Sequence, residues 1–211
     1  VFWSTAPNGR TLLGALIEAT IARHGHLDIL VNNASTFYPT RVGEITEAHW
    51  EDLMGTNLRA PLFLSQAAAP HLAAREGLIL NIADIHGLRP LRHHPVYSPA
   101  KAGLIMLTQS LARELAPHVR VNAVAPGPVE FPDKGLTEEM KQAIIDKTLL
   151  KRRGSPEDIA RAALFFATDE AEGVTELRVI DARDFAAEPV ARVVLPQRVP
   201  YGAHGSWLPA G

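Results

Sequence analysis

A tyrosine, a lysine and an aspartate are spaced so that they could transfer a proton. Tyr97 and Lys101 are four residues apart in a segment predicted to be helical, so their side chains lie on one face. An ammonium close to a phenol favours the phenolate and lowers its pKa, which suits proton donation near neutral pH. Asp84 ends a predicted strand whose tip would lie beside that helix. Surface helices contain Tyr-x-x-x-Lys pairs by chance, so the case depends on the surrounding elements.

Short apolar segments alternate along the chain with segments of helical periodicity. The predicted strands are 27–31, 77–83 and 119–124, and the predicted helices are 11–24, 47–74 with breaks, 96–115, 137–147 and 156–168. This alternation predicts an α/β fold with a partial doubly wound, Rossmann-like parallel sheet and flanking helices. In such sheets the site lies beyond the carboxyl ends of the strands, where the polar loops are 32–39, 84–95 and 126–132.

Four motifs follow one another along residues 11–173. In chain order they are Asn32-Asn33-Ala34, Asn57, Tyr97-Ser98-Pro99-Ala100-Lys101 and Pro126-Gly127. Together they resemble the short-chain dehydrogenase/reductase family. The resemblance implies an NAD(P)-dependent oxidoreductase in which Tyr97 is the catalytic acid/base and Lys101 tunes it. It also implies that Asn57 holds a water that relays protons. The residues that it assigns to the cofactor are Asn33, Ala34, Tyr97, Lys101, Pro126 and Gly127.

One position departs from the general pattern of that family. Most members carry a serine thirteen residues before the tyrosine, and this chain has Asp84 there, as in the pteridine reductases. A carboxyl group can hydrogen-bond or protonate a pterin ring nitrogen, whereas a hydroxyl suits a ketone. The resemblance therefore implies a pterin-like or dihydrofolate-like substrate, contacted by Ser35, Phe37 and Asp84, with NADP as cofactor and NAD not excluded. The alternatives are a general carbonyl or alcohol oxidoreductase and a non-catalytic fused fragment.

Two parts of the family pattern do not match this chain. No glycine-rich turn for the cofactor pyrophosphate precedes Thr11, so we expect weak cofactor binding and impaired turnover. After residue 176 the sequence becomes short apolar segments separated by prolines, and residues 177–208 resemble the C-terminal end of a carotenoid oxygenase. We therefore expect a truncated reductase domain over 1–175 and an irregular, β-like tail over 176–211. His204 would be an iron ligand without companions.

Composition excludes several other classes of protein. The formal net charge is −2, without a long basic run, so neither a nucleic-acid nor a membrane partner is expected. Cysteine is absent, which fits a cytoplasmic protein, and the nine histidines show no metal-binding spacing. We expect no metal. In the resembling family the helices around 56–74 and 96–115 form subunit contacts, so a homo-oligomer is possible.

Overall fold

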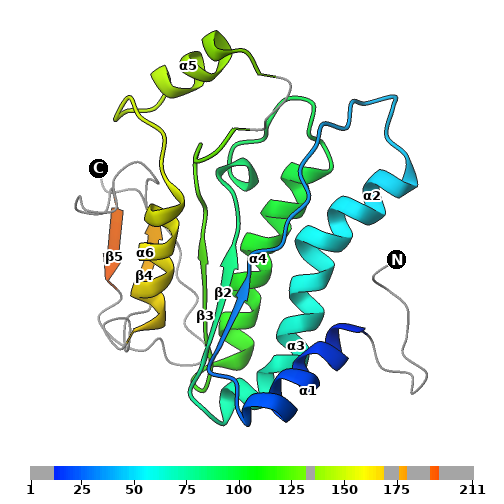
Figure 1. Ribbon diagram of the computed structural model, residues 1–211, viewed down its shortest axis with the longest axis vertical. Helices are drawn as coiled ribbons and strands as arrows, with labels where there is room; N and C mark the ends of the chain where they lie inside the picture. Colours follow the sequence, from blue (N-terminus) through cyan, green and yellow to red (C-terminus); the bar gives the residue numbers. More distant parts are fainter. Residues whose placement is uncertain (1–11, 132–135, 169–175, 180–190, 195–211) are drawn as a thin grey trace.

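The computed structural model describes residues 12–131, 136–168, 176–179 and 191–194. At its centre lies a parallel sheet in the order β1-β2-β3, formed by Ile29–Asn32, Leu78–Ile82 and Arg120–Val124 (Figure 1). The helices are α1 (Leu12–His24), α2 (Glu47–Met54), α3 (Ala60–Ala73), α4 (Tyr97–Leu115), α5 (Glu138–Asp146) and α6 (Pro156–Ala167). The predicted α/β parallel architecture is confirmed.

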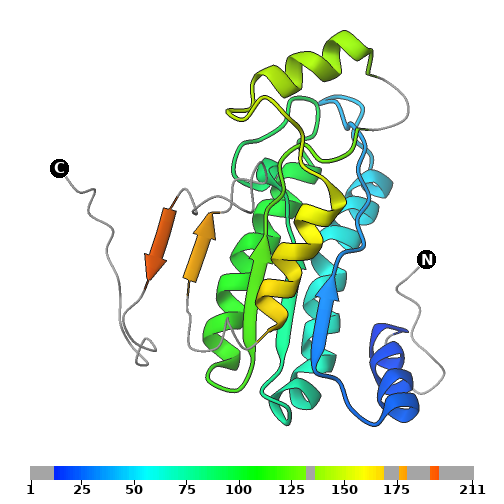
Figure 2. The same cartoon turned by 60° about the vertical axis from the view of Figure 1, so that its left-hand side comes forward.

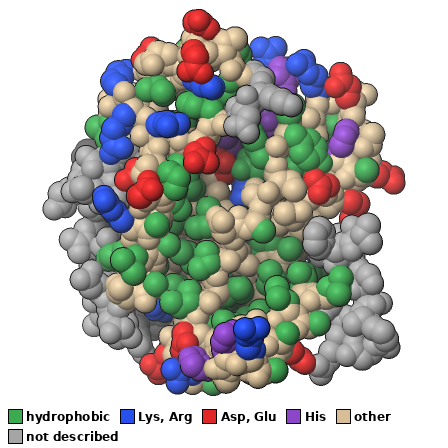
Figure 3. Space-filling view, viewed as in Figure 1, with side chains coloured by type: hydrophobic (Ala, Val, Ile, Leu, Met, Phe, Trp, Pro, Cys, Tyr) green, Lys and Arg blue, Asp and Glu red, His purple; other side chains and the backbone are tan. Residues whose placement is uncertain are grey.

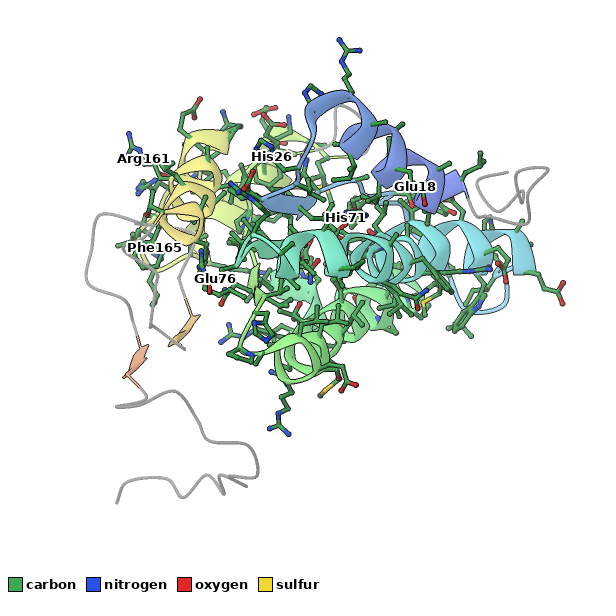
Figure 4. All side chains as sticks on the ribbon, turned by 90° about the horizontal axis from the view of Figure 1, so that it is seen from below. Glu18, His26, His71, Glu76, Arg161 and Phe165 are labelled. Carbon is green, nitrogen blue, oxygen red and sulfur yellow. The ribbon has the colours of Figure 1, made fainter. Side chains whose placement is uncertain are left out.

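Helices cover both faces of this sheet. Ile17 of α1 and Leu72 of α3 share one apolar cluster with Ile79 of β2, whereas Phe166 of α6 packs on the opposite face against Leu80. Figure 2 shows α6 on one side of the strands and α3 and α4 on the other. In Figure 4, Glu18 and His71 mark α1 and α3, which lie side by side. Alternate residues of β2 therefore enter two separate cores, as expected for a strand buried on both faces.

Strand β1 is less well covered than β2. Ile29 and Val31 are on the α6 face of β1, and they remain 39% and 47% exposed because α6 packs over β2 and β3. Figure 3 shows hydrophobic side chains gathered over the middle of this face of the molecule. The described sheet therefore has an open, partly apolar edge at β1.

A π-helical turn divides the long helical segment after β1, and Pro70 lies inside α3. Residues Gly55–Arg59 form one π-helical turn between α2 and α3, and the Ala60 N–H bonds to the Gly55 carbonyl. Pro61 follows at once, where it can start a helix but cannot donate a backbone hydrogen bond. Other helix starts follow from capping side chains: Thr46, Thr137 and Ser155 each accept a bond from a backbone N–H three residues ahead.

The described part of the tail forms a small sheet of its own. The sequence predicted an irregular, β-like tail over residues 176–211. Within it, β4 (Glu176–Val179) and β5 (Ala191–Val194) pair antiparallel as a separate two-stranded sheet. Each strand bonds to the other along one side, so this pairing satisfies the backbone groups on the two facing sides. Ile180, His204 and all tail residues outside β4 and β5 lie beyond the described ranges.

A glycine fixes the distance between the loop after β2 and helix α4. A Cβ added to Gly87 would lie 2.8 Å from the Lys101 carbonyl carbon and 2.9 Å from the Ala102 nitrogen, both backbone atoms of α4. The short helix η2 (Ile85–Gly87), which directly follows Asp84, can therefore approach α4 only with glycine here.

We predict that Gly87→Ala destabilises the fold by about 1–3 kcal/mol, because the backbone of α4 must move to admit the methyl group. Gly103→Ala is the matched control, since its Cβ would meet the flexible Leu58 side chain instead, and its effect should stay within about 1 kcal/mol. Urea denaturation measures both variants. Equal stability of the two would contradict the close approach of η2 to α4.

Candidate active site

Asp84 and Tyr97 are joined by a short hydrogen bond where β2 and α4 meet. The Tyr97 hydroxyl donates to Asp84 Oδ2 at 2.6 Å, and Asp84 Oδ1 accepts the His86 N–H at 2.7 Å. Tyr97 is the first residue of α4 and is 3% exposed, while Asp84 caps η2 immediately after β2. The end of one strand and the start of one helix thus hold the two groups in contact across thirteen residues of sequence.

Lys101 lies one helical turn beyond Tyr97. Its side chain is buried, its Nζ donates to the Ile82 carbonyl at 3.0 Å, and Nζ lies 5.8 Å from the centre of the Tyr97 ring. The ammonium therefore lies beside the phenol ring and bonds to the backbone of β2. The sequence placed Asp84, Tyr97 and Lys101 in one site, and the structure brings all three together.

The direction of the Tyr97 pKa differs from the sequence expectation. An activating lysine was expected to lower it. Burial, followed by the charge and the hydrogen bond of Asp84, instead raises the Tyr97 pKa above its ordinary value, and the Ser35 hydroxyl opposes this only in part. The carboxylate is in direct contact with the hydroxyl, whereas the ammonium is not. Tyr97 is therefore a protonated, weak acid at neutral pH.

Burial has the opposite effect on the lysine. It lowers the Lys101 pKa from 10.5 to about 8, although the Asp84 charge acts to raise it. Removal of an ammonium from water disfavours its charged form, and here this cost exceeds the attraction to the carboxylate. Lys101 is consequently still mainly protonated at pH 7 but loses its proton in mildly alkaline solution.

Asn57 lies in the π-helical turn and fastens the loop after β1. It is 1% exposed, accepts the Ser35 hydroxyl at 2.6 Å, and donates to the Thr36 carbonyl at 3.0 Å and the Leu53 carbonyl at 2.9 Å. These partners belong to the loop and to the preceding helix. The structure thus connects Asn57 to the Tyr97 site through Ser35. Single π-helical turns within α-helices are frequently found at functional sites.

Phe37 packs against the site from the same loop. Its ring stacks on the His94 ring, with centroids 4.7 Å apart and an angle of 10° between the planes. The Phe37 and Tyr97 rings meet edge to face, with centroids 4.8 Å apart. The sequence predicted that Phe37 contacts a substrate, and the structure shows that the imidazole already covers one of its faces. The ring is nevertheless 44% exposed.

The residues predicted to bind a cofactor border the same end of the sheet. Asn33 and Ala34 are exposed directly after β1, and Pro126 and Gly127 are half-buried after β3. The Pro126 carbonyl accepts the Ile85 N–H at 3.0 Å, which joins the loops after β2 and β3. All four residues therefore lie beyond the carboxyl ends of the strands, on loops next to Asp84.

Sequence reasoning gave no role to a cavity that neighbours this site. It has a volume of about 610 Å³, and its walls include Arg41, Glu44, His93, His94 and Ser98. None of the residues predicted for the site lines it. The segment Arg89-Pro90-Leu91-Arg92-His93-His94-Pro95, basic and bounded by prolines, was the available signal in the sequence.

The described ranges contain neither a candidate membrane span nor a candidate metal cluster. No helix among those residues is both long and apolar enough to cross a membrane. Within the same part of the chain, no cluster of three or more His, Cys, Asp or Glu side chains could hold a metal ion.

Comparison with known proteins identifies the family. Residues 10–180 match the family profile described as enoyl-(acyl carrier protein) reductase. Tropinone reductase-like 3 of Erythroxylum coca is 38% identical over 172 residues, which cover 79% of this chain and 66% of that protein. A 3-oxoacyl-(acyl-carrier-protein) reductase of Thermotoga maritima is 32% identical over 169 residues, which cover 79% of this chain and 69% of that protein. The chain belongs to the short-chain dehydrogenase/reductase family, whose members are NAD(P)-dependent oxidoreductases.

Solved structures agree with this assignment. A protein of Sinorhizobium meliloti 1021 described as a short-chain alcohol dehydrogenase superimposes with a TM-score of 0.71 at 32% identity, covering 75% of this chain and 65% of that one. The fold is therefore the Rossmann-like fold of that family, and the chain spans about two thirds of the length of the relatives it matches. A second profile, described as retinal pigment epithelial membrane protein, matches residues 152–209, which include the tail.

We predict that Lys101→Met stabilises the fold at pH 7 by up to about 3 kcal/mol, the cost that corresponds to the lowered pKa. The folded state binds the Lys101 proton less tightly than the unfolded state does. This group therefore adds stability as pH rises from about 8 towards 10.5, and the advantage of the variant should shrink over that range. Chemical denaturation at pH 7 and pH 10 measures this, with the exposed Lys147→Met as control. A variant less stable than the parent chain at pH 7 would contradict it.

Proposed function

We propose that this chain is an NAD(P)H-dependent reductase in which Tyr97 donates the proton and Asp84 and Lys101 control that proton. The observation that carries the proposal is the 2.6 Å hydrogen bond between the Tyr97 hydroxyl and Asp84, beside the buried Lys101 ammonium. Family membership supports the reaction class. Because the chain spans about two thirds of its relatives, activity remains a proposal for it.

The residues present fit the nicotinamide half of the cofactor. An ammonium has three N–H donors, and the Ile82 carbonyl takes one from Lys101, so a ribose diol suits the remaining donors. Asn33, Ala34, Pro126 and Gly127 would border the bound cofactor on the loops after β1 and β3. When bound, the dihydronicotinamide supplies a hydride to the substrate. NADP rather than NAD is our proposal from the resemblance alone.

Tyr97 would supply the proton that balances this hydride. The O–H bond of Tyr97 breaks and its proton moves to the substrate atom that has gained the electron pair, leaving a phenolate that solvent reprotonates. The neighbouring ammonium of Lys101 offsets the negative charge that develops on the phenolate. Asp84, held by the His86 N–H, orients the hydroxyl and can accept an N–H from the substrate on its free lone pairs.

We further propose that the substrate carries a carbon–nitrogen double bond, as dihydropterins and dihydrofolate do. Burial and then Asp84 make Tyr97 a weaker acid, and a more basic proton acceptor suits such a donor. Hydride addition to C=N creates a nitrogen anion, which is more basic than the alkoxide formed from C=O. Asp84 could also bond to a ring N–H. Ser35 and Phe37 would contact the substrate from the loop after β1, and Asn57 would position Ser35.

A carbonyl or alcohol substrate is the alternative, and the names of the relatives favour it. Besides the two reductases above, D-xylose 1-dehydrogenase of Caulobacter vibrioides is 38% identical over 159 residues, covering 74% of this chain and 64% of that protein. These names cover unrelated substrates, so they support the reaction class more than any one substrate. We propose a cytoplasmic protein, with homo-association as its expected mode of assembly.

The boundary between the reductase part and the tail is also a proposal. We place it between residues 175 and 176. The match to the family profile ends at residue 180, and the match to the second profile extends from residue 152 to residue 209. On this proposal residues 176–211 derive from the end of a carotenoid oxygenase and add no iron chemistry, because His204 alone cannot form such a site.

Substrate competition tests the reductase and its substrate class. With millimolar NADPH, the chain should reduce a dihydropterin with a higher kcat/KM than a simple ketone. Asp84→Ser should lower kcat/KM for the dihydropterin by at least about tenfold while sparing the ketone, because a hydroxyl serves a carbonyl oxygen. Tyr97→Phe should lower both values by about 10²–10⁴-fold.

Each result decides one part of the proposal. If the parent chain prefers the ketone, or if Asp84→Ser lowers both values equally, the C=N substrate is wrong and the reductase remains. If Tyr97→Phe retains full turnover, or if neither substrate oxidises NADPH, the proposed activity is wrong. Asp146→Ser on the exposed end of α5 is the control, and it should change neither value.

A further inference from the structure

The cavity beside the Tyr97 site is built by the loops after β1 and β2. Its walls come from Arg41 and Glu44 on one loop and from His93 and His94 on the other, and Ser98 closes it at the start of α4. Ser98 directly follows Tyr97, and the His94 and Tyr97 rings are 6.4 Å apart. The cavity is therefore one side chain away from the proposed proton donor.

Two arginines lie at or next to the cavity. Arg41 lines the cavity and Arg92 adjoins it, and within the described ranges neither guanidinium has an ion pair or a side-chain hydrogen bond. Partial burial and then the charges of Arg41 and Arg92 lower the pKa of His93, which reports the same positive potential. Glu44 is the opposing charge. In Figure 3, basic and histidine side chains lie close together at the upper right, with acidic side chains next to them.

His94 is an independent indication of a ligand. It is 9% exposed, and its Nδ1 lies 2.9 Å from the Arg92 carbonyl, which can only accept, so Nδ1 carries a proton. Its other nitrogen, Nε2, is buried and has no hydrogen-bond partner among the described residues. A buried polar atom without a partner is unfavourable, so a ligand that bonds to Nε2 would recover part of this cost.

The two loops are locked together at this point. The Thr40 N–H donates to the His93 carbonyl at 2.7 Å, and His93 has a positive φ of 66°, which is unfavourable for a residue with a side chain. The Thr40 hydroxyl is a second buried polar atom without a partner in the described ranges. Strain and unpaired polar groups thus coincide beside one cavity, a combination that is typical of binding sites.

We propose that this cavity is an anion-binding subsite, in which Arg41 and His94 hold a carboxylate or phosphate group of the substrate. The anion would bond to Nε2 through a shared proton, so the unpaired nitrogen would gain a partner. The assignment of the anion to the substrate rests on the proposed reductase function. Anion binding itself does not require turnover.

Direct titration with inorganic phosphate and with acetate tests the subsite without any cofactor. Calorimetry gives the affinity, and the ¹⁵N chemical shift of His94 Nε2 reports whether the anion reaches this nitrogen. We expect binding together with a shift of Nε2 towards the protonated value. Arg41→Gln should weaken binding by at least about tenfold, and Glu44→Gln should strengthen it, because the opposing carboxylate is removed. Arg113→Gln, an exposed charge near the end of α4, should have no effect.

If Arg41→Gln and Arg113→Gln weaken binding equally, or if Nε2 does not shift, the subsite is wrong and the anion binds by general charge. The better of the two anions identifies the group as phosphate or carboxylate.

A second comparison tests the link to the substrate. A dihydropterin carboxylate should have a lower KM than its methyl ester, and Arg41→Gln should remove the difference. Equal KM values with anion binding intact would overturn the link to the substrate. Absence of turnover with anion binding intact would count against the reductase and not against the subsite.

Discussion

A chain of buried amide and hydroxyl groups determines where the candidate site can form. Asn81 in the middle of the sheet accepts a bond from the Asn32 side chain at 2.8 Å and donates one to the Thr108 hydroxyl at 2.9 Å, and Thr108 donates to the Leu104 carbonyl at 2.8 Å. These bonds tie β1, β2 and α4 together inside an apolar core, where unpaired groups would be costly. The carboxyl ends of β1 and β2 and the start of α4 are thereby held at a fixed separation.

The arrangement of the reactive groups follows from this. Strand β2 delivers Asp84 at its end, α4 begins at Tyr97, and Gly87 allows the short helix between them to approach α4 closely. The carboxylate therefore contacts the phenol directly, while the Lys101 ammonium binds to the backbone of β2. Burial of the phenol and then the adjacent carboxylate both raise the Tyr97 pKa, so the tyrosine is a weaker acid rather than a stronger one.

On our proposal, the loops beyond the strands add a second function to the same end of the sheet. Phe37 stacks on His94 and also contacts Tyr97, the proposed proton donor, so this aromatic pair lies beside both Tyr97 and the cavity. A substrate that reaches Tyr97 and also carries an anionic group would contact both regions at once. Such an arrangement would allow binding energy at the anionic end to orient the reacting end.

The sequence by itself determined the order of strands and helices, the parallel sheet and the family, because apolar periodicity and motif spacing are properties of the chain alone. It also determined which side chains meet at the carboxyl ends of the strands. Only the tertiary structure decided the direction of the Tyr97 pKa, the pairing of β4 with β5, and the cavity at Arg41 and His94. Each of these depends on distances between segments that are remote in sequence, such as the contact of Asp84 with Tyr97 or of Thr40 with His93. Charge interactions and burial vary over a few ångströms, and residue spacing does not specify distances at that scale.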